Sequence, residues 1–103
     1  MAYQIRWAPQ AADDLEDICC FIARDSEYYA ALFATSIMEI VINIPEFPLS
    51  GRVVPEFEDE NIRERIYRDY RIIYRLKDDF VEIAAIHHGS KLLNAVIQTP
   101  FEK

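Results

Sequence analysis

The chain has 103 residues, of which 51% are hydrophobic and 13% aromatic, so a single domain with one core, spanning residues 1–103, is expected. The net charge of -7 and the pI of about 4.7 weigh against nucleic acid as the main partner, because phosphate binding needs clustered Lys and Arg. The sequence shows no signal-peptide-like start and no apolar run long enough to cross a bilayer, so a cytoplasmic protein with no membrane partner is expected.

Local periodicity predicts a strand and then a helix at the N-terminus. Residues 3–7 alternate apolar with polar side chains, which is typical of a short strand. Pro9 suits the first turn of a helix that is predicted from Gln10 to about Arg24. One face of this helix carries apolar residues at helical spacing: Ala11, Leu15, Ile18 and Ile22.

A second helix is predicted from Glu27 to Ile44, with Asp25 or Ser26 as its cap. The β-branched segment 40–42 would suit a strand by itself, but the helical spacing extends over the whole stretch. Pro45 ends the helix. The predicted core-facing stripe comprises Tyr29, Phe33, Ile37, Ile40, Val41 and Ile44.

The rest of the chain is predicted to be β-structure. A turn-rich connector (47–52), a short extended piece (53–55) and an acidic loop (56–60) precede it. Three strands at 61–67, 70–76 and 80–87 are separated by short polar turns, which favours antiparallel hairpins. Residues 90–97 suit either a short helix or an edge strand. The order β-α-α-β-β-β predicts an α+β fold, with two N-terminal helices packed on a largely antiparallel sheet.

Several classes of site have no counterpart in the sequence. With only Gly51 and Gly89, neither a dinucleotide fingerprint nor a Walker loop can be built. Cys19 and Cys20 are adjacent, which is poor geometry for a disulfide, and we expect one to be a small core residue and the other to have no role. The acidic residues at 13–17 are interpreted as a solvated helix start. No cofactor and no metal are therefore expected.

Cations are concentrated between residues 63 and 77, which hold six of the eleven Lys and Arg residues. Arginine binds phosphate and carboxylate through a bidentate fork. Residues of like parity share a face of a strand, so we predict that neighbouring strands gather these cations into one binding surface. The alternative is a strand face whose arginines pair with Glu56, Glu58, Glu64 or Asp69. The predicted binding surface comprises Arg63, Arg65, Arg71 and Arg75.

Two adjacent histidines end the last predicted strand, so one must lie on each side of the sheet. Histidine titrates near neutral pH and serves as a general acid or base. Near Arg71 and Arg75, His87 or His88 would help to cleave a phosphodiester. The alternative is a histidine that only forms hydrogen bonds at a strand end.

Five segments of the chain form a set of motifs in a recognisable order: Trp7 to Ile22, Phe47 to Glu56, Asn61 to Glu64, Asp69 to Arg75 and Ile86 to Lys91. Taken together, these segments resemble the RelE/ParE toxin superfamily over nearly the whole chain. No single motif is decisive, but their order matches that of the family. The resemblance implies the β-α-α-β-β-β fold and a cognate antitoxin partner.

The resemblance also implies two alternative activities. RelE-type members bind the ribosome and cut mRNA, which would make Arg71, His87, His88 and Lys91 the catalytic candidates here. The tyrosine of that pattern is missing, since its position falls near Ile97. ParE-type members poison DNA gyrase and have no accepted catalytic residues.

A net charge of -7 penalises approach to ribosomal RNA, so a gyrase-binding toxin is preferred over a ribonuclease. A member that has lost its toxicity is a third possibility.

Overall fold

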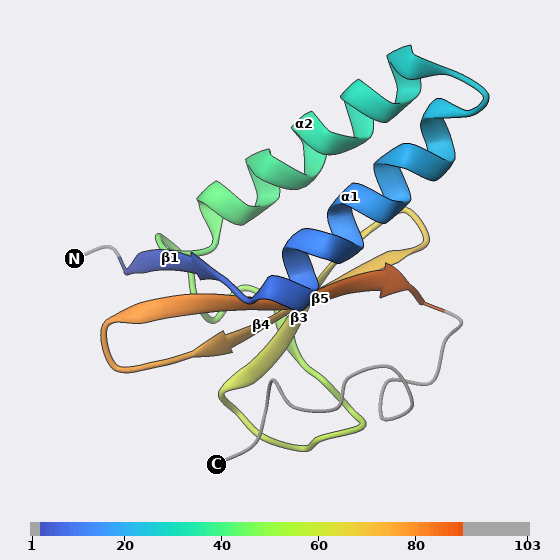
Figure 1. Ribbon diagram of the computed structural model, residues 1–103. Helices are drawn as coiled ribbons and strands as arrows, with labels where there is room; N and C mark the ends of the chain where they lie inside the picture. The colour runs from blue at the N-terminus through green and yellow to red at the C-terminus, as the bar shows by residue number, and fades with distance from the viewer. Residues whose placement is uncertain (1–2, 90–103) are drawn as a thin grey trace.

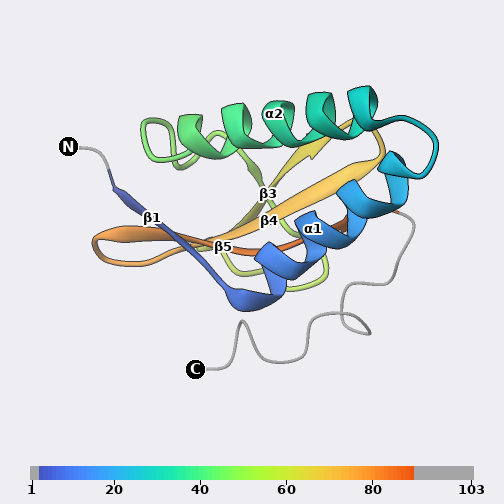
Figure 2. The ribbon, with the colours of Figure 1, turned by 45° about the horizontal axis from the view of Figure 1, so that its top comes forward.

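The structure, a computed structural model, describes residues 3–89. Two helices lie side by side and antiparallel over one face of a five-stranded sheet (Figures 1 and 2). The predicted element order and α+β class are confirmed, and the short extended piece expected at 53–55 is a two-residue strand at 52–53. In chain order the elements are β1 (Gln4–Trp7), α1 (Pro9–Ala23), α2 (Glu27–Asn43), β2 (Arg52–Val53), β3 (Ile62–Tyr67), β4 (Tyr70–Leu76) and β5 (Phe80–His88).

The sheet is mixed, with strand order β1-β5-β4-β3-β2. Strands β2 to β5 pair antiparallel with their neighbours, and β1 pairs parallel with β5 at one edge. The prediction of a largely antiparallel sheet is confirmed. The parallel pair at the edge joins the two ends of the described chain.

Helix α1 is positioned by its apolar face and by one hydrogen bond to the sheet. Ala11 is fully buried, and the other residues of the predicted stripe pack against the same core. Asp14 Oδ2 accepts a hydrogen bond from the backbone N–H of Ile86 at 3.0 Å. This carboxylate therefore holds the start of α1 against β5.

Helix α2 begins at the predicted cap, where Ser26 Oγ accepts a hydrogen bond from the N–H of Tyr29 at 3.1 Å. The predicted stripe is confirmed from Phe33 onward, because its residues lie in the core or pack against it. Tyr29 is the exception, with 61% of its surface exposed. It lies at the tip of the helix hairpin and packs edge-on against Tyr28 instead of entering the core.

The main core lies between the helices and the sheet. It is formed by residues of α1, α2, β4 and β5. Apolar residues from the helices and from the strands are therefore buried in the same layer. Its buried members are Ala11, Phe33, Ile37, Val41, Ile44, Ile72, Tyr74, Val81, Ile83 and Ile86.

A second, smaller core covers the opposite face of the sheet. Phe57, in the segment between β2 and β3, packs onto it. Strands β4 and β5 are consequently covered on both faces, and runs of consecutive residues are buried instead of every second one. The buried members are Val54, Ile62, Ile73, Ala84 and Ala85.

Both cysteines are free, with Cys20 exposed and Cys19 packed against the main core. The prediction that one of the two cysteines packs as a small residue on the core is confirmed for Cys19.

Candidate functional site

The predicted gathering of four arginines on one surface is wrong. A two-residue turn joins β3 to β4, so Tyr67 lies opposite Tyr70 and Arg63 opposite Tyr74. Odd-numbered residues of β3 therefore share a face with even-numbered residues of β4. Arg63 and Arg65 lie on the helix-covered side of the sheet, whereas Arg71 and Arg75 lie on the opposite side.

Arg63 and Arg65 bind the connector that leads from α2 to β2. Arg63 donates from Nη1 to the Gly51 carbonyl at 2.9 Å and from Nε to the Glu60 carbonyl at 2.8 Å. Arg65 donates from Nη1 to Asn43 Oδ1 and to the hydroxyl of Ser50 in the connector, both at 3.2 Å. Through these contacts both side chains hold the neighbouring loop segments in place. Their assignment to a target-binding surface stays a prediction.

Tyr74 is a third residue that holds the connector, and nothing in the sequence beyond its aromatic character indicated this role. Its ring is fully buried. Its hydroxyl donates to the Pro48 carbonyl at 2.8 Å and accepts from the Gly51 N–H at 3.0 Å. Burial raises the pKa of this phenol above its usual value, which keeps the hydroxyl protonated and able to donate.

Arg71 lies at the centre of an ion-pair network on the opposite face. Its two terminal nitrogens donate to both oxygens of Glu56 at 2.9 Å, and its Nε donates to Glu64 Oε1 at 2.5 Å. The other oxygen of Glu64 pairs with Arg52. The Arg71 side chain is 8% exposed and the Glu64 side chain is fully buried. The alternative interpretation, that arginines of this region pair with nearby carboxylates, is confirmed for Arg71.

This ion-pair network shifts the pKa of Glu56 and the pKa of Arg71. The hydrogen bonds from Arg71 lower the pKa of Glu56 to about 2, against an ordinary value of 4.5. The same contact raises the pKa of the Arg71 guanidinium above its ordinary value. Both groups are therefore charged at neutral pH, and the acidic loop is held against the sheet by a bidentate pair.

The stability of the fold is expected to decline in acid because of Glu56. In the unfolded chain this carboxylate protonates near 4.5, but in the folded chain only near 2. Its contribution is therefore complete above the unfolded pKa and is lost as the pH falls through this window. Urea unfolding between pH 7 and pH 3 measures it.

The stability gap between the wild type and Glu56→Gln should be largest at neutral pH and should shrink as the pH falls. Glu60→Gln is the matched control, since Glu60 is an exposed carboxylate of the same loop. A gap for Glu56→Gln that stays constant across the range would contradict the role given to this ion pair.

The two histidines lie on opposite sides of the sheet, as predicted. His87 pairs across the strands with Arg71 and is 5% exposed. His88 is exposed and makes an edge-on contact with the Tyr70 ring, at 5.5 Å between centroids. Register thus brings His87 and Arg71 together, but the arginine is already bound to two carboxylates.

Two shallow pockets flank this end of the sheet. One of about 250 Å³ lies beside α1 and is lined by Asp14, Asp17, Phe21 and both histidines, among others. The other, of about 280 Å³, has a mixed lining of arginines, His88, Asp69 and apolar residues. The cations there include Arg52, Arg68 and Arg71.

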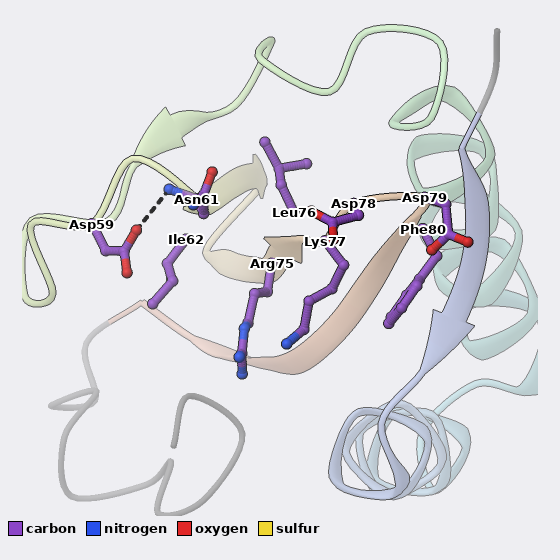
Figure 3. A pocket seen from close by; sticks show the side chains of 9 residues that line it. All are labelled: Asp59, Asn61, Ile62, Arg75, Leu76, Lys77, Asp78, Asp79 and Phe80. Atoms are coloured by element: carbon purple, nitrogen blue, oxygen red, sulfur yellow. Dashed lines mark hydrogen bonds between the residues drawn. The ribbon is translucent and has the colours of Figure 1, made fainter. Parts of the chain in front are cut away.

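Arg75 lies away from this cluster, at a pocket of about 560 Å³ beside the β4–β5 turn. Figure 3 shows its side chain and that of Lys77 extending in the same direction into the opening. On the facing wall, Asp59 Oδ1 accepts a hydrogen bond from the Asn61 N–H at 2.8 Å. With Asp78 and Asp79 also in the lining, the pocket carries both signs of charge and offers no dedicated anion site.

Lys91, the remaining catalytic candidate, lies outside the described residues, as does the ambiguous segment 90–97. Within residues 3–89, no group of three or more His, Cys, Asp or Glu side chains is arranged to hold a metal ion. None of the helices in this part of the chain is long and apolar enough to cross a membrane.

Three solved structures that resemble this fold come from toxin–antitoxin systems. A chain of the chromosomal ParDE system from P. aeruginosa superposes with a TM-score of 0.69 at 21% identity, covering 84% of this chain and 96% of that one. A chain of the RelBE2 toxin–antitoxin complex from Mycobacterium tuberculosis gives 0.59 at 19% identity, covering 85% and 99%. A mutant of the E. coli toxin RelE in the free state gives 0.60 at 14% identity, covering 87% and 86%.

The sequence itself matches one family. No curated protein sequence matches the chain. The family model described as "ParE toxin of type II toxin-antitoxin system, parDE" matches residues 5–93, which is most of the chain. The chain therefore belongs to the ParE family of type II toxin–antitoxin toxins, within the RelE/ParE superfamily.

Proposed function

We propose that this protein is a ParE-type toxin that binds and inhibits DNA gyrase in the cytoplasm and causes growth arrest without a catalytic step of its own. The observation that carries the proposal is the state of Arg71. A phosphate-binding arginine must offer its guanidinium to the substrate. Here Glu56 and Glu64 occupy both edges of that group. The match to the ParE family over residues 5–93 supports the same choice.

The proposal includes a cognate antitoxin that neutralises the toxin, with plasmid or chromosome stabilisation as the consequence. Its support is the class of the relatives, since one structural neighbour is described as a toxin–antitoxin complex. Two modes suit such a partner, a helix laid in an apolar groove or a strand added to a sheet edge.

The alternative is a RelE-like ribosome-dependent endoribonuclease. One observation supports this alternative: the β4–β5 register places His87 directly across from Arg71. In that mechanism His87 or His88 would move the proton, and Arg71 and Lys91 would bind the phosphate. Glu56 would first have to leave Arg71 at a substantial cost, since the buried guanidinium would keep only Glu64 as its partner.

Two measurements on one culture test the proposal. The toxin is induced without its antitoxin in a bacterial host that carries a DNA-damage reporter, and mRNA ends are mapped in the same cells. We expect growth arrest with the reporter on and with intact mRNA. New mRNA ends with a silent reporter would establish the ribonuclease, and growth without arrest would indicate a member that has lost its toxicity.

Purified components supply the matched experiment. Supercoiling of relaxed plasmid by gyrase is expected to be inhibited by the wild type and equally by the His87→Gln/His88→Gln double variant, because neither histidine has a catalytic task in this proposal. Thermal unfolding of the double variant controls for folding. Loss of inhibition in a folded double variant would argue against the proposed function.

A further inference from the structure

Helix α2 is apolar on both of its faces. One face is buried against the sheet, as described above. The opposite face has a second apolar stripe, in which Tyr28, Leu32, Met38 and Ile42 are 71%, 41%, 38% and 63% exposed. From Tyr28 to Asn43 the only charged residue is Glu39. A helix of this kind is normally buried all round, and within residues 3–89 nothing covers its outer stripe.

The spacing of the stripe is that of a helix-docking face. Leu32, Met38 and Ile42 follow Tyr28 at i+4, i+10 and i+14, with the small exposed residue Thr35 at i+7. The stripe is about 21 Å long at 1.5 Å per residue. Contiguous apolar surface of this extent on a small domain marks an interaction site.

Charge indicates what kind of partner fits. Residues 9–47, which include both helices, contain eight acidic residues and one basic residue, and the rest of the chain contains ten of each. The entire net charge of -7 therefore belongs to the helical layer. Most of these carboxylates are exposed around the stripe and along α1: Asp13, Glu16, Asp17, Asp25, Glu27, Glu39 and Glu46.

We propose that the outer face of α2 docks a cationic amphipathic helix of a partner protein, with apolar side chains on the Tyr28–Ile42 stripe and Lys or Arg side chains toward the surrounding carboxylates. The inference goes beyond the proposed function, because it does not depend on which target the toxin inhibits. A second copy of this chain fits poorly, because it would bring two layers of like charge together.

A designed peptide tests the proposal directly. The probe is a fluorescent synthetic helix of about 18 residues with a leucine stripe flanked by lysines. Two control peptides keep the leucines but carry glutamates, or keep the composition in scrambled order. Fluorescence anisotropy against the full chain should show binding of the first peptide, roughly tenfold or more tighter than either control. Added salt should weaken this binding.

Variants of the chain locate the binding site. The Leu32→Gln/Ile42→Gln double variant should bind the lysine peptide about tenfold or more weakly, since two exposed anchors of the stripe are lost. Both positions are exposed, so the fold should be retained. Ile66→Gln is the matched control, because Ile66 is 52% exposed on the other side of the sheet; it should bind as the wild type does.

Three results would overturn the inference. If the glutamate peptide bound as tightly as the lysine peptide, the carboxylates around the stripe would not select a cationic partner. Unchanged binding by the Leu32→Gln/Ile42→Gln variant would place the contact elsewhere. A stable wild-type dimer in sedimentation, dissociated by the same double variant, would make a second copy the occupant. Since gyrase inhibition is measured separately, its failure would leave these readouts unaffected.

Discussion

Arg71→Met is expected to destabilise the protein by about 3–5 kcal/mol, because it leaves the carboxylates of Glu56 and Glu64 without their principal partner. Arg71 is 8% exposed and Glu64 fully buried, so water cannot replace the hydrogen bond that Glu64 loses. The acidic loop between β2 and β3 should detach from the sheet as a result. Denaturant unfolding at neutral pH measures the change in free energy.

A double-mutant cycle separates this ion-pair effect from loss of packing. Adding Glu64→Leu to Arg71→Met should restore part of the stability, with a coupling of about 1–3 kcal/mol, because the buried carboxylate is removed with its partner. Arg52→Met is the control at the solvent end of the network, where the side chain is 63% exposed. It should cost less than about 1 kcal/mol. Strictly additive effects in the cycle would refute the network.

Gly51→Ala is expected to cost about 3 kcal/mol through a steric clash. A Cβ atom at this position would lie 2.5 Å from the Glu64 carbonyl oxygen and 2.6 Å from the Tyr74 hydroxyl oxygen. The first neighbour is backbone and the second is bound at both sides, so neither can move away easily. The backbone at Gly51 does not have a positive φ angle, so the cost is due to space alone.

Gly89→Ala is the matched control for this substitution. Its Cβ would meet the Asp69 carbonyl oxygen at 3.3 Å and the Arg71 side chain at 3.6 Å or more. We expect a loss below about 1 kcal/mol, since these neighbours need to shift little. Thermal or urea unfolding of the two variants side by side checks the ranking. Equal losses at the two glycines would show that the tight contact at Gly51 is not the cause.

These two expected results bear on function as well as on stability. Arg71 is a catalytic candidate of the alternative function, and Gly51 lies in the connector segment that carries part of the family resemblance. In this fold one holds the acidic loop and the other admits the close approach of the connector to β3 and β4. A loss of toxicity in either variant therefore has to be interpreted together with its unfolding curve.

The positions of helices and strands were predictable from the sequence because they depend on local patterns. Helical spacing predicted α1 and α2 to within a residue or two at each end, and alternation with short turns predicted β3, β4 and β5. Tyr29 was misplaced because spacing alone does not say where a helix extends beyond the sheet. The outer stripe of α2 was not predicted from the sequence, and its exposure is visible only in the structure.

The sequence by itself determined the element order, the core-facing stripes and the family. The elements and stripes depend on the spacing of residues near one another in the chain, and the family resemblance depends on the order of the motifs. Tertiary structure alone decided which carboxylates pair with Arg71, whereas the arginine surface was mispredicted because residue parity was compared without the hairpin register. The two-residue turn at 68–69 pairs residues of unlike parity, and so it separates Arg63 and Arg65 from Arg71 and Arg75. Folding of the loop then brought Glu56 to Arg71 across fifteen positions, because a buried guanidinium requires a carboxylate whatever its distance along the chain.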